Sequence, residues 1–155
     1  MNRTHPRQHP TGLKHLFSFF VLFWLLPLSA ALAAENSALE IHDDGVFQEL
    51  DHNTLWRMER SKKLKTSSEV QQYLKILNTG AYSDWRLPTK RELYELDTIF
   101  DLKRNGEVRI QLEGGYWLTD GNGNISAGAW EIGDGCGPER TFFTRKKGYV
   151  RAVRP

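Results

Sequence analysis

Basic side chains gather in one short polar segment of this chain. Ser61-Lys-Lys-Leu-Lys-Thr66 has the basic-basic-x-basic spacing associated with heparin-like polyanions, and two arginines lie just before it. Several cations close together can hold sulfates or phosphates, with an affinity that falls as salt rises. The predicted polyanion patch consists of Arg57, Arg60, Lys62, Lys63 and Lys65. The alternative is a solvated loop before a helix, because charge runs usually just face water.

A second basic segment, Arg145-Lys146-Lys147, falls in a predicted hairpin turn near the end of the chain. The same two interpretations apply to it. The hypothesis of a polyanion site gains support if the two basic segments converge in space.

A glycine-rich segment supplies a different set of candidate ligand groups. Asp120-Gly-Asn-Gly-Asn124 offers side-chain oxygens at alternating positions, as calcium loops do. Ile125 stands where an EF-hand needs glycine, and no bidentate glutamate follows, so an EF-hand is excluded. The other interpretations are a weak, looser calcium site that includes Asp134 and a plain turn built from Asn and Gly. Aromatic platforms, amides and a carboxylate are the mixture that sugar sites use, so the predicted carbohydrate contacts are Trp117, Asp120, Asn122, Asn124 and Trp130.

Residues suited to catalysis are few. His52 follows Asp51, but neighbours in sequence rarely face each other in a strand or turn. Cys136 is the only cysteine, so an intrachain disulfide is excluded, and the thiol is either buried or free and reactive. We therefore predict no catalytic residue and no cofactor, and we expect a ligand-binding protein that is not an enzyme. The alternatives are a protein-interaction or envelope-assembly module and an enzyme that depends on His52 or Cys136.

The first 33 residues have the three regions of a secretory signal peptide. Residues 1–15 carry three basic side chains and no acid, residues 16–28 are apolar, and small residues surround Ala31-Leu32-Ala33. We predict cleavage after Ala33 and a periplasmic or extracellular location. The alternative is an uncleaved anchor, since residues 16–34 are just long enough to span a bilayer.

Loss of this leader changes the charge of the protein. It carries 3 of the 21 basic residues and none of the 19 acidic ones, which leaves 18 against 19, or −1. A near-neutral chain offers no global electrostatic case for nucleic acid as a partner. We expect residues 34–43 to form a short tail or a first edge element, and residues 44–155 to form one domain.

The first half of that domain has the pattern of a hairpin followed by two helices. Turn formers separate Val46-Phe47 from residues 55–58, which indicates the hairpin. The first helix begins with one of two capping pairs, Ser68 and Gln71 or Thr66 and Glu69, and its apolar face is Val70, Tyr73, Leu74 and Leu77.

A proline and a second capping pair mark the start of the next helix. Pro88 keeps Leu87 extended, and Thr89 with Glu92 forms a capping box for a helix over residues 90–100. We expect Trp85, just before it, to fill the core, while Asp84 and Arg86 satisfy loop backbone or each other. The alternative is that these three side chains form a recognition edge.

Short strands and glycine turns make up the second half. The strand candidates are residues 108–112, 116–119, 129–132, 141–143 and 149–153. In the last of them Val150 and Ala152 alternate with Tyr149, Arg151 and Val153, which suits a half-buried antiparallel strand. Together the two halves predict an α+β domain, with two helices packed on a small, mainly antiparallel sheet that has long loops.

The central motif resembles the signature of the Lcl C-terminal domain family, named after a collagen-like bacterial surface protein. It consists here of Tyr82, Ser83, Asp84, Trp85, Arg86, Leu87 and Pro88, followed by Glu92-Leu93. Weaker similarities follow in the family's order at Tyr116-Trp117, Ala129-Trp130 and residues 149–154, and Asn53-Thr54-Leu55-Trp56 resembles its entry motif. The resemblance covers residues 44–155.

The resemblance implies a C-type-lectin-like fold and a ligand that is a carbohydrate, a glycosaminoglycan-like polyanion or another envelope component. Sulfatase-modifying oxidases have a related fold but depend on a reactive cysteine pair, which a single cysteine cannot supply. Family members often carry cysteines where this chain has Leu74 and Ala152, so packing is expected to replace that staple. The family's glycine before Leu55 is also absent, which leaves the geometry of that turn open.

Overall fold

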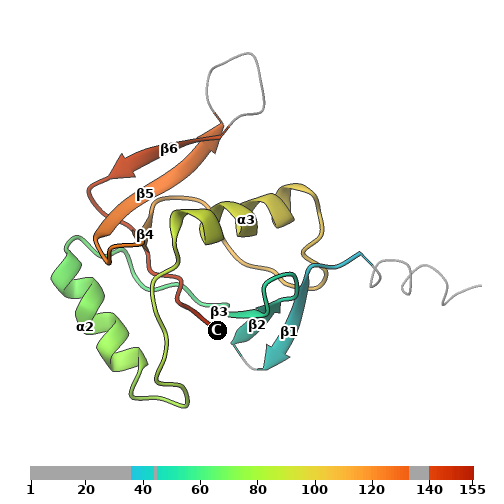
Figure 1. The fold of residues 1–155 in the computed structure, drawn as a ribbon, viewed down its shortest axis with the longest axis horizontal. Coiled ribbons are helices and arrows are strands. Elements are labelled where there is room, and N and C mark those ends of the chain that lie inside the picture. Colours follow the sequence, from blue (N-terminus) through green and yellow to red (C-terminus); the bar gives the residue numbers. More distant parts are fainter. Residues whose placement is uncertain (1–35, 44, 133–139) are drawn as a thin grey trace, which may run out of the picture.

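The computed structural model describes residues 36–43, 45–132 and 140–155. The predicted leader, Cys136 and Asp134 lie outside these residues. Two helices and two antiparallel sheets form the described part, so the α+β prediction is confirmed at that level (Figure 1). The first sheet has the order β1 (Leu39–Asp43), β2 (Val46–Glu49), β3 (Thr54–Arg57) and β7 (Val153–Arg154). The second has the order β4 (Tyr116–Thr119), β5 (Ile125–Ile132) and β6 (Arg140–Arg145).

The predicted hairpin is confirmed as β2 and β3, and β1 adds an edge strand beside it. Of the two expectations for residues 34–43, the edge element is therefore present. Asn53 makes the β2–β3 turn with a left-handed φ of 55°, and its side-chain oxygen accepts from Gln48 Nε2 at 2.6 Å. Asparagine tolerates this conformation better than most residues, so the turn forms without glycine.

Both helices begin at reciprocal capping boxes. Helix α2 (Ser67–Leu77) starts from Thr66 and Glu69, which selects the second of the two predicted pairs. Helix α3 (Lys90–Asp101) starts from Thr89 and Glu92, as predicted. The buried face of α3 is Leu93, Leu96 and Ile99, whereas Phe100 is only half-buried.

Hydrogen bonds and ion pairs hold the segment between the two helices in place. Trp85 is 4% exposed and lies in the core, and its backbone N–H and carbonyl pair with the Asn78 side chain at 2.8 and 2.9 Å. Asp84 and Arg86 do not satisfy each other. Asp84 forms a bidentate pair with Arg154, and Arg86 forms one with Glu92. The structural interpretation of this motif is the one that the contacts support.

Two of the predicted strands differ from the structure. Residues 108–112 join neither of the two sheets of the described structure. Backbone carbonyls of this segment accept from side chains instead of a neighbouring strand, and the Gln111 carbonyl accepts from both Tyr116 Oη and Arg151 Nη2. Residues 149–152 form only isolated pairing before β7, and Val150, Arg151 and Ala152 are buried, so the segment is covered on both faces rather than one. Val150 and Ala152 enter one core cluster and Val153 another, so the predicted alternation of faces is correct.

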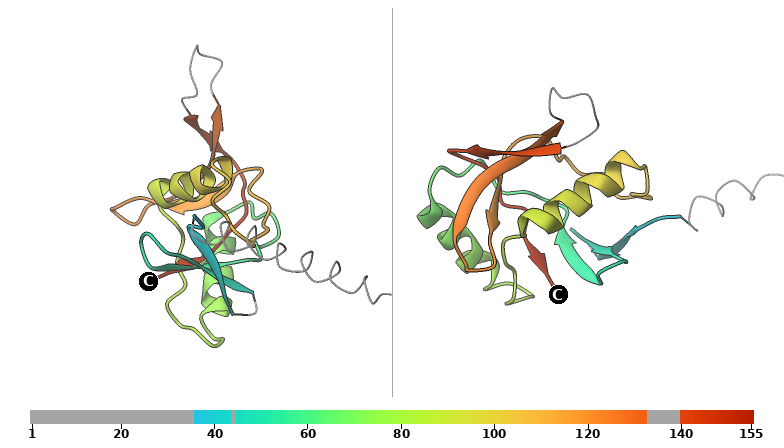
Figure 2. Two further views of the ribbon diagram at one scale, coloured as in Figure 1. Left: turned by 90° about the vertical axis from the view of Figure 1, so that its right-hand side faces the viewer. Right: turned by 45° about the horizontal axis from the view of Figure 1, so that its top comes forward.

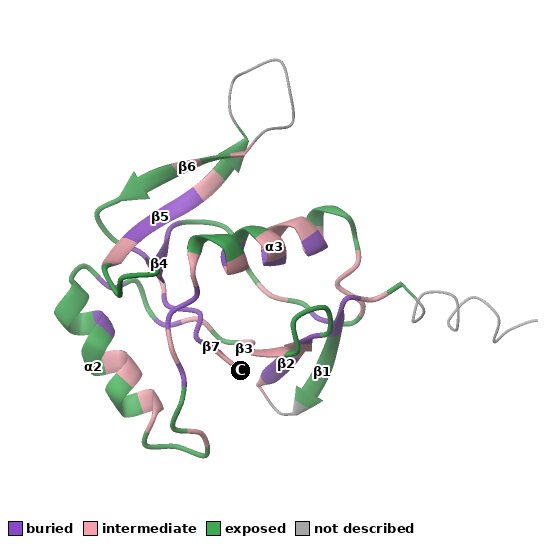
Figure 3. Ribbon diagram, viewed as in Figure 1, coloured by how far each residue is buried: buried purple, intermediate pink, exposed green. Residues whose placement is uncertain are grey.

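Helix α3 lies between the two sheets in the views of Figures 1 and 2. Leu93 packs with Tyr116 and Leu118 of β4, while Leu96 packs with Phe47 and Trp56 of the first sheet. Helix α2 buries Val70 and leaves its outer face exposed (Figure 3). Leu74 packs against the cluster that contains Ala152, so apolar packing occupies the two positions where the resembling family carries cysteines.

Candidate functional site

The two basic segments meet in space. Leu64 and Gly148 form an antiparallel bridge with two backbone hydrogen bonds, Leu64 N to Gly148 O at 2.8 Å and Gly148 N to Leu64 O at 3.0 Å. Leu64 is 4% exposed and Gly148 is buried, so the bridge is part of the fold. In this antiparallel register Lys65 lies opposite Lys147 and Lys63 lies opposite Tyr149, so the two basic segments are adjacent.

Further backbone contacts fix the bridge in place. Tyr149 N donates to Gly115 O and Trp117 N donates to Tyr149 O, both at 2.8 Å. A Cβ on Gly148 would stand 2.8 Å from the Gly115 carbonyl oxygen, closer than real Cβ atoms come to backbone. The absence of a side chain at Gly148 is thus what allows this approach.

We call the exposed lysines at this bridge the lysine patch. Among the described residues none of them forms an ion pair with a carboxylate. Glu69 is close by, but its carboxylate accepts from the backbone N–H groups of Lys65 and Thr66 at 2.5 and 3.2 Å. The Lys65 N–H is the chief reason that the pKa of Glu69 is lowered. The patch consists of Lys62, Lys63, Lys65, Lys146 and Lys147, all of them exposed.

Three arginines near the patch are engaged elsewhere. Arg60 donates to Gln111 Oε1 at 2.7 Å and to Glu113 O at 2.8 Å, and it lies 3.9 Å from the ring centroid of Tyr149. Arg57 is half-buried, with its guanidinium 6.0 Å from the Trp85 ring. Arg145 forms an ion pair with Glu131. Of the five residues predicted for the polyanion patch, the three lysines are therefore exposed, Arg57 is half-buried, and Arg60 is hydrogen-bonded although it contacts the same Tyr149 ring as Lys63.

The predicted carbohydrate contacts do not form one surface. Trp117 is 7% exposed, and its indole N–H donates to Leu64 O at 3.2 Å, so it belongs to the core. Trp130 is half-buried and bonds to the Lys90 carbonyl at 3.0 Å. Its ring meets Tyr94 and Phe142 edge-on at 5.1 and 5.3 Å.

The Asp120 loop satisfies its own polar groups. Asp120 Oδ1 accepts from the backbone N–H groups of Asn122 and Asn124 at 2.9 and 2.8 Å, and Oδ2 accepts from Asn124 Nδ2 at 2.8 Å. The Asn124 side chain is the main reason that the pKa of Asp120 is lowered. These contacts fit the turn interpretation.

His52 has a partner that its sequence neighbours did not indicate. Its Nδ1 lies 2.6 Å from Glu49 Oε1, and this contact raises the pKa of His52. Glu49 is 2% exposed and also accepts from Thr54 Oγ1 at 3.0 Å. Asp51 is instead 3.7 Å from Arg104. The His52–Glu49 pair thus closes the β2–β3 turn.

In the part of the chain that the structure describes, no group of three or more His, Cys, Asp or Glu is placed to hold a metal ion. None of the helices described there is long and apolar enough to cross a membrane.

Comparison with protein-family models, with curated proteins and with solved structures gives no significant match to this chain.

Proposed function

We propose that this chain is an exported domain that binds a polyanionic glycan of the glycosaminoglycan type through the lysine patch. The observation that carries the proposal is the Leu64–Gly148 bridge, which joins two basic segments that lie far apart in the sequence. Basic charge from either segment alone would be an ordinary solvated loop.

The chemistry of the patch suits a ligand with repeated charges. Its five side chains are flexible ammonium groups, which act as point charges rather than as the rigid forks that arginine offers. Such groups hold sulfates or phosphates spread along a chain better than they define one small ligand. The protein without its leader is near neutral, so the attraction is local to this face.

The resemblance to the Lcl C-terminal domain family supports the same ligand class, and we propose a C-type-lectin-like arrangement and a periplasmic or extracellular location with it. The two helices and the glycine-punctuated second half agree with that arrangement in coarse outline.

Binding to immobilised heparin tests the proposal. Replacement of Lys63 and Lys147 by Gln removes one cation from each side of the bridge and should weaken binding about tenfold, or about 1.4 kcal/mol. The matched control replaces Lys75 and Lys103, which are exposed lysines outside the patch, by Gln. Equal retention of the two double variants, or absence of binding to heparin at low salt, would refute the proposed function.

A further inference from the structure

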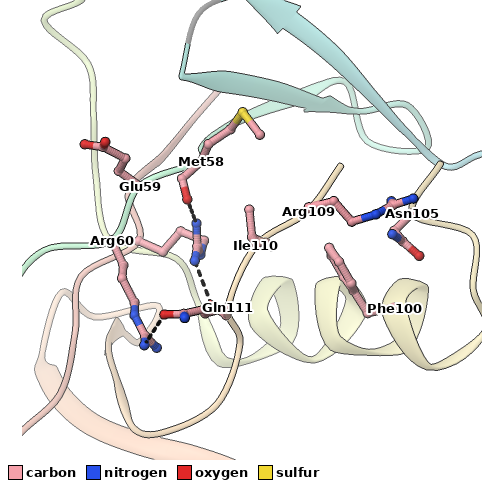
Figure 4. A pocket seen from close by; sticks show the side chains of 9 residues that line it. Met58, Glu59, Arg60, Phe100, Asn105, Arg109, Ile110 and Gln111 are labelled. Atoms are coloured by element: carbon pink, nitrogen blue, oxygen red, sulfur yellow. Dashed lines mark hydrogen bonds between the residues drawn. The ribbon is translucent and has the colours of Figure 1, made fainter. Parts of the chain in front are cut away.

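A second basic feature is an open cavity at the surface of the molecule, with exposed residues such as Arg109 and Gln111 in its lining. A cavity of about 700 Å³ is bounded by residues 58–60, by Phe100 of α3 and by residues 105–111, with Arg151 among its lining residues. Figure 4 shows Met58, Ile110 and Phe100 around the same space. The volume falls within the range of sites for small organic ligands.

Arg151 is the most deeply buried charge in this cavity, with 1% of its surface exposed. Its guanidinium donates to the carbonyls of Arg57 at 2.8 Å, of Met58, and of Gln111 at 2.8 Å. Its Nε has no hydrogen-bond partner in the described part of the chain. Burial lowers the pKa of Arg151. Carbonyl oxygens satisfy its donors but do not neutralise its charge, which a buried cation ordinarily requires.

Two more guanidiniums line the cavity and are also bound to neutral groups. Arg109 donates to the carbonyls of Gly106 at 2.5 Å and Val108 at 3.1 Å. Arg60 donates to Gln111 Oε1, to Glu113 O and to Tyr116 Oη. Across the described residues, none of the three lining arginines is within ion-pair distance of a carboxylate.

The acidic residue of the lining forms no ion pair with these arginines in the described part of the chain. Glu59 is the acidic residue that lines the cavity, within the described part of the chain. Figure 4 shows its carboxylate directed away from Ile110 and Phe100. Its charge is felt instead by Tyr73 of α2, whose pKa is raised chiefly by burial and in part by Glu59. The lining therefore carries three positive charges and one negative charge, which is directed away from the apolar wall.

The remaining walls are apolar. Met58, Phe100 and Ile110 are half-buried and pack against the core cluster that contains Leu96 and Val153. They offer a ligand an apolar surface next to the arginines. Inorganic phosphate or sulfate would leave that surface unused, whereas an anion with a hydrocarbon body would cover it.

We propose that this cavity binds an amphipathic organic carboxylate, with its carboxylate at the end where Arg60 and Arg151 both donate to Gln111, and with its hydrocarbon body on Met58, Phe100 and Ile110. Guanidinium groups bind carboxylates with paired, charge-assisted hydrogen bonds, and the ligand supplies the negative charge that Arg151 lacks. This site goes beyond the proposed polyanion function, because no residue of the lysine patch lines it.

Calorimetric titration of the protein with octanoate tests the site, with acetate and octylammonium as the two comparison ligands. We expect octanoate to bind at least tenfold more tightly than either, because acetate lacks the apolar body and octylammonium has the wrong charge. Equal affinity for octanoate and octylammonium, or absence of octanoate binding at millimolar concentration, would overturn the proposal.

Variants locate the binding on the molecule. Arg60→Gln removes one of the two guanidiniums at the carboxylate end of the cavity and should weaken octanoate binding about tenfold, with circular dichroism to check that the variant is folded. Arg91→Gln, an exposed arginine at the start of α3, is the matched control and should bind as the unmodified protein does. The Lys63→Gln, Lys147→Gln double variant should retain full octanoate affinity, which separates this site from the polyanion proposal. If Arg60→Gln and Phe100→Ala both bind octanoate normally, the ligand lies elsewhere and the assignment is wrong.

Discussion

Two basic regions meet at Tyr149 and use different cations in different ways. Lys63 Nζ is 5.4 Å from the Tyr149 ring centroid, and the Arg60 guanidinium is 3.9 Å from it. The lysine patch is exposed and unpaired in the described structure, whereas the arginines of the cavity donate to carbonyls and hold loops together. A count of basic residues would treat the two regions alike. Their hydrogen bonds separate charge that supports the fold from charge that makes no ion pair or hydrogen bond within the described structure.

The largest effect is expected where the comparison assigns charge to the fold. Arg151→Ala leaves the carbonyls of Arg57, Met58 and Gln111 without their donor and opens a void, so the free energy of unfolding should fall by about 3 kcal/mol or more. Lys63→Ala removes an exposed side chain and should change it by no more than about 0.5 kcal/mol. Urea unfolding measures both. Similar losses in the two variants would remove the distinction between the regions.

Asp97 is a half-buried acid whose ionisation should make the stability of the fold depend on pH. Burial raises the pKa of Asp97 from 3.8 to about 7, with a smaller contribution from Asp101. Because the folded state holds this proton more tightly, the stabilisation is complete below about pH 4 and is lost as pH rises through 7. Asp97→Asn should flatten that dependence and raise the free energy of unfolding at pH 8 by about 2 to 4 kcal/mol. Unfolding curves between pH 4 and 8 that are parallel for both proteins would contradict this account.

A change at the bridge should affect both fold and binding. In Gly148→Ala the new Cβ meets the Gly115 carbonyl, and the forced shift should cost about 1 to 3 kcal/mol of stability. It should also part the two lysine segments and weaken heparin binding while the protein is still folded. Gly121→Ala is the matched control, because a Cβ there meets nothing within 4 Å. Circular dichroism and heparin retention, measured on both variants, decide the point.

The smallest effect concerns the acid beside the patch. Glu69→Gln keeps an acceptor for the Lys65 and Thr66 N–H groups but removes a negative charge next to Lys62 and Lys65. Heparin affinity should rise about twofold to threefold at low salt, and the gain should vanish at high salt because exposed charges are screened. An unchanged affinity at low salt would place the bound chain away from Lys65.

Local signals explain which elements could be predicted from the sequence. The capping pair Thr89 and Glu92 and the spacing of Leu93 and Leu96 were enough for α3, because each depends on residues a few positions apart. The Leu64–Gly148 bridge joins residues 84 positions apart, so only the fold reveals it. The alternating pattern of the last strand gives no sign that Arg151 is buried, yet its guanidinium donates to carbonyls of two other segments.

The candidate site was predictable in part for the same reason. Side-chain type and spacing identified Lys62, Lys63 and Lys65. The segment around Lys147 could join them only if the two segments converge in space, and the Leu64–Gly148 bridge provides that convergence. Trp117 was misplaced because an aromatic residue in a strand has the same sequence signature on either face. Its indole N–H satisfies the Leu64 carbonyl inside the molecule. The prediction of a strand over residues 108–112 was wrong because side chains, rather than the backbone of a neighbouring strand, donate to the Gln111 carbonyl.

The salt dependence of heparin binding tests the central claim most directly. Release of counterions makes the logarithm of the association constant fall linearly with the logarithm of salt concentration, by about one unit of slope for each cation that contacts the polyanion. We predict that replacement of Lys63 and Lys147 by Gln lowers the slope by about two, and that replacement of Lys75 and Lys103 leaves it unchanged. An identical slope in all three proteins would mean that the lysine patch does not contact the polyanion.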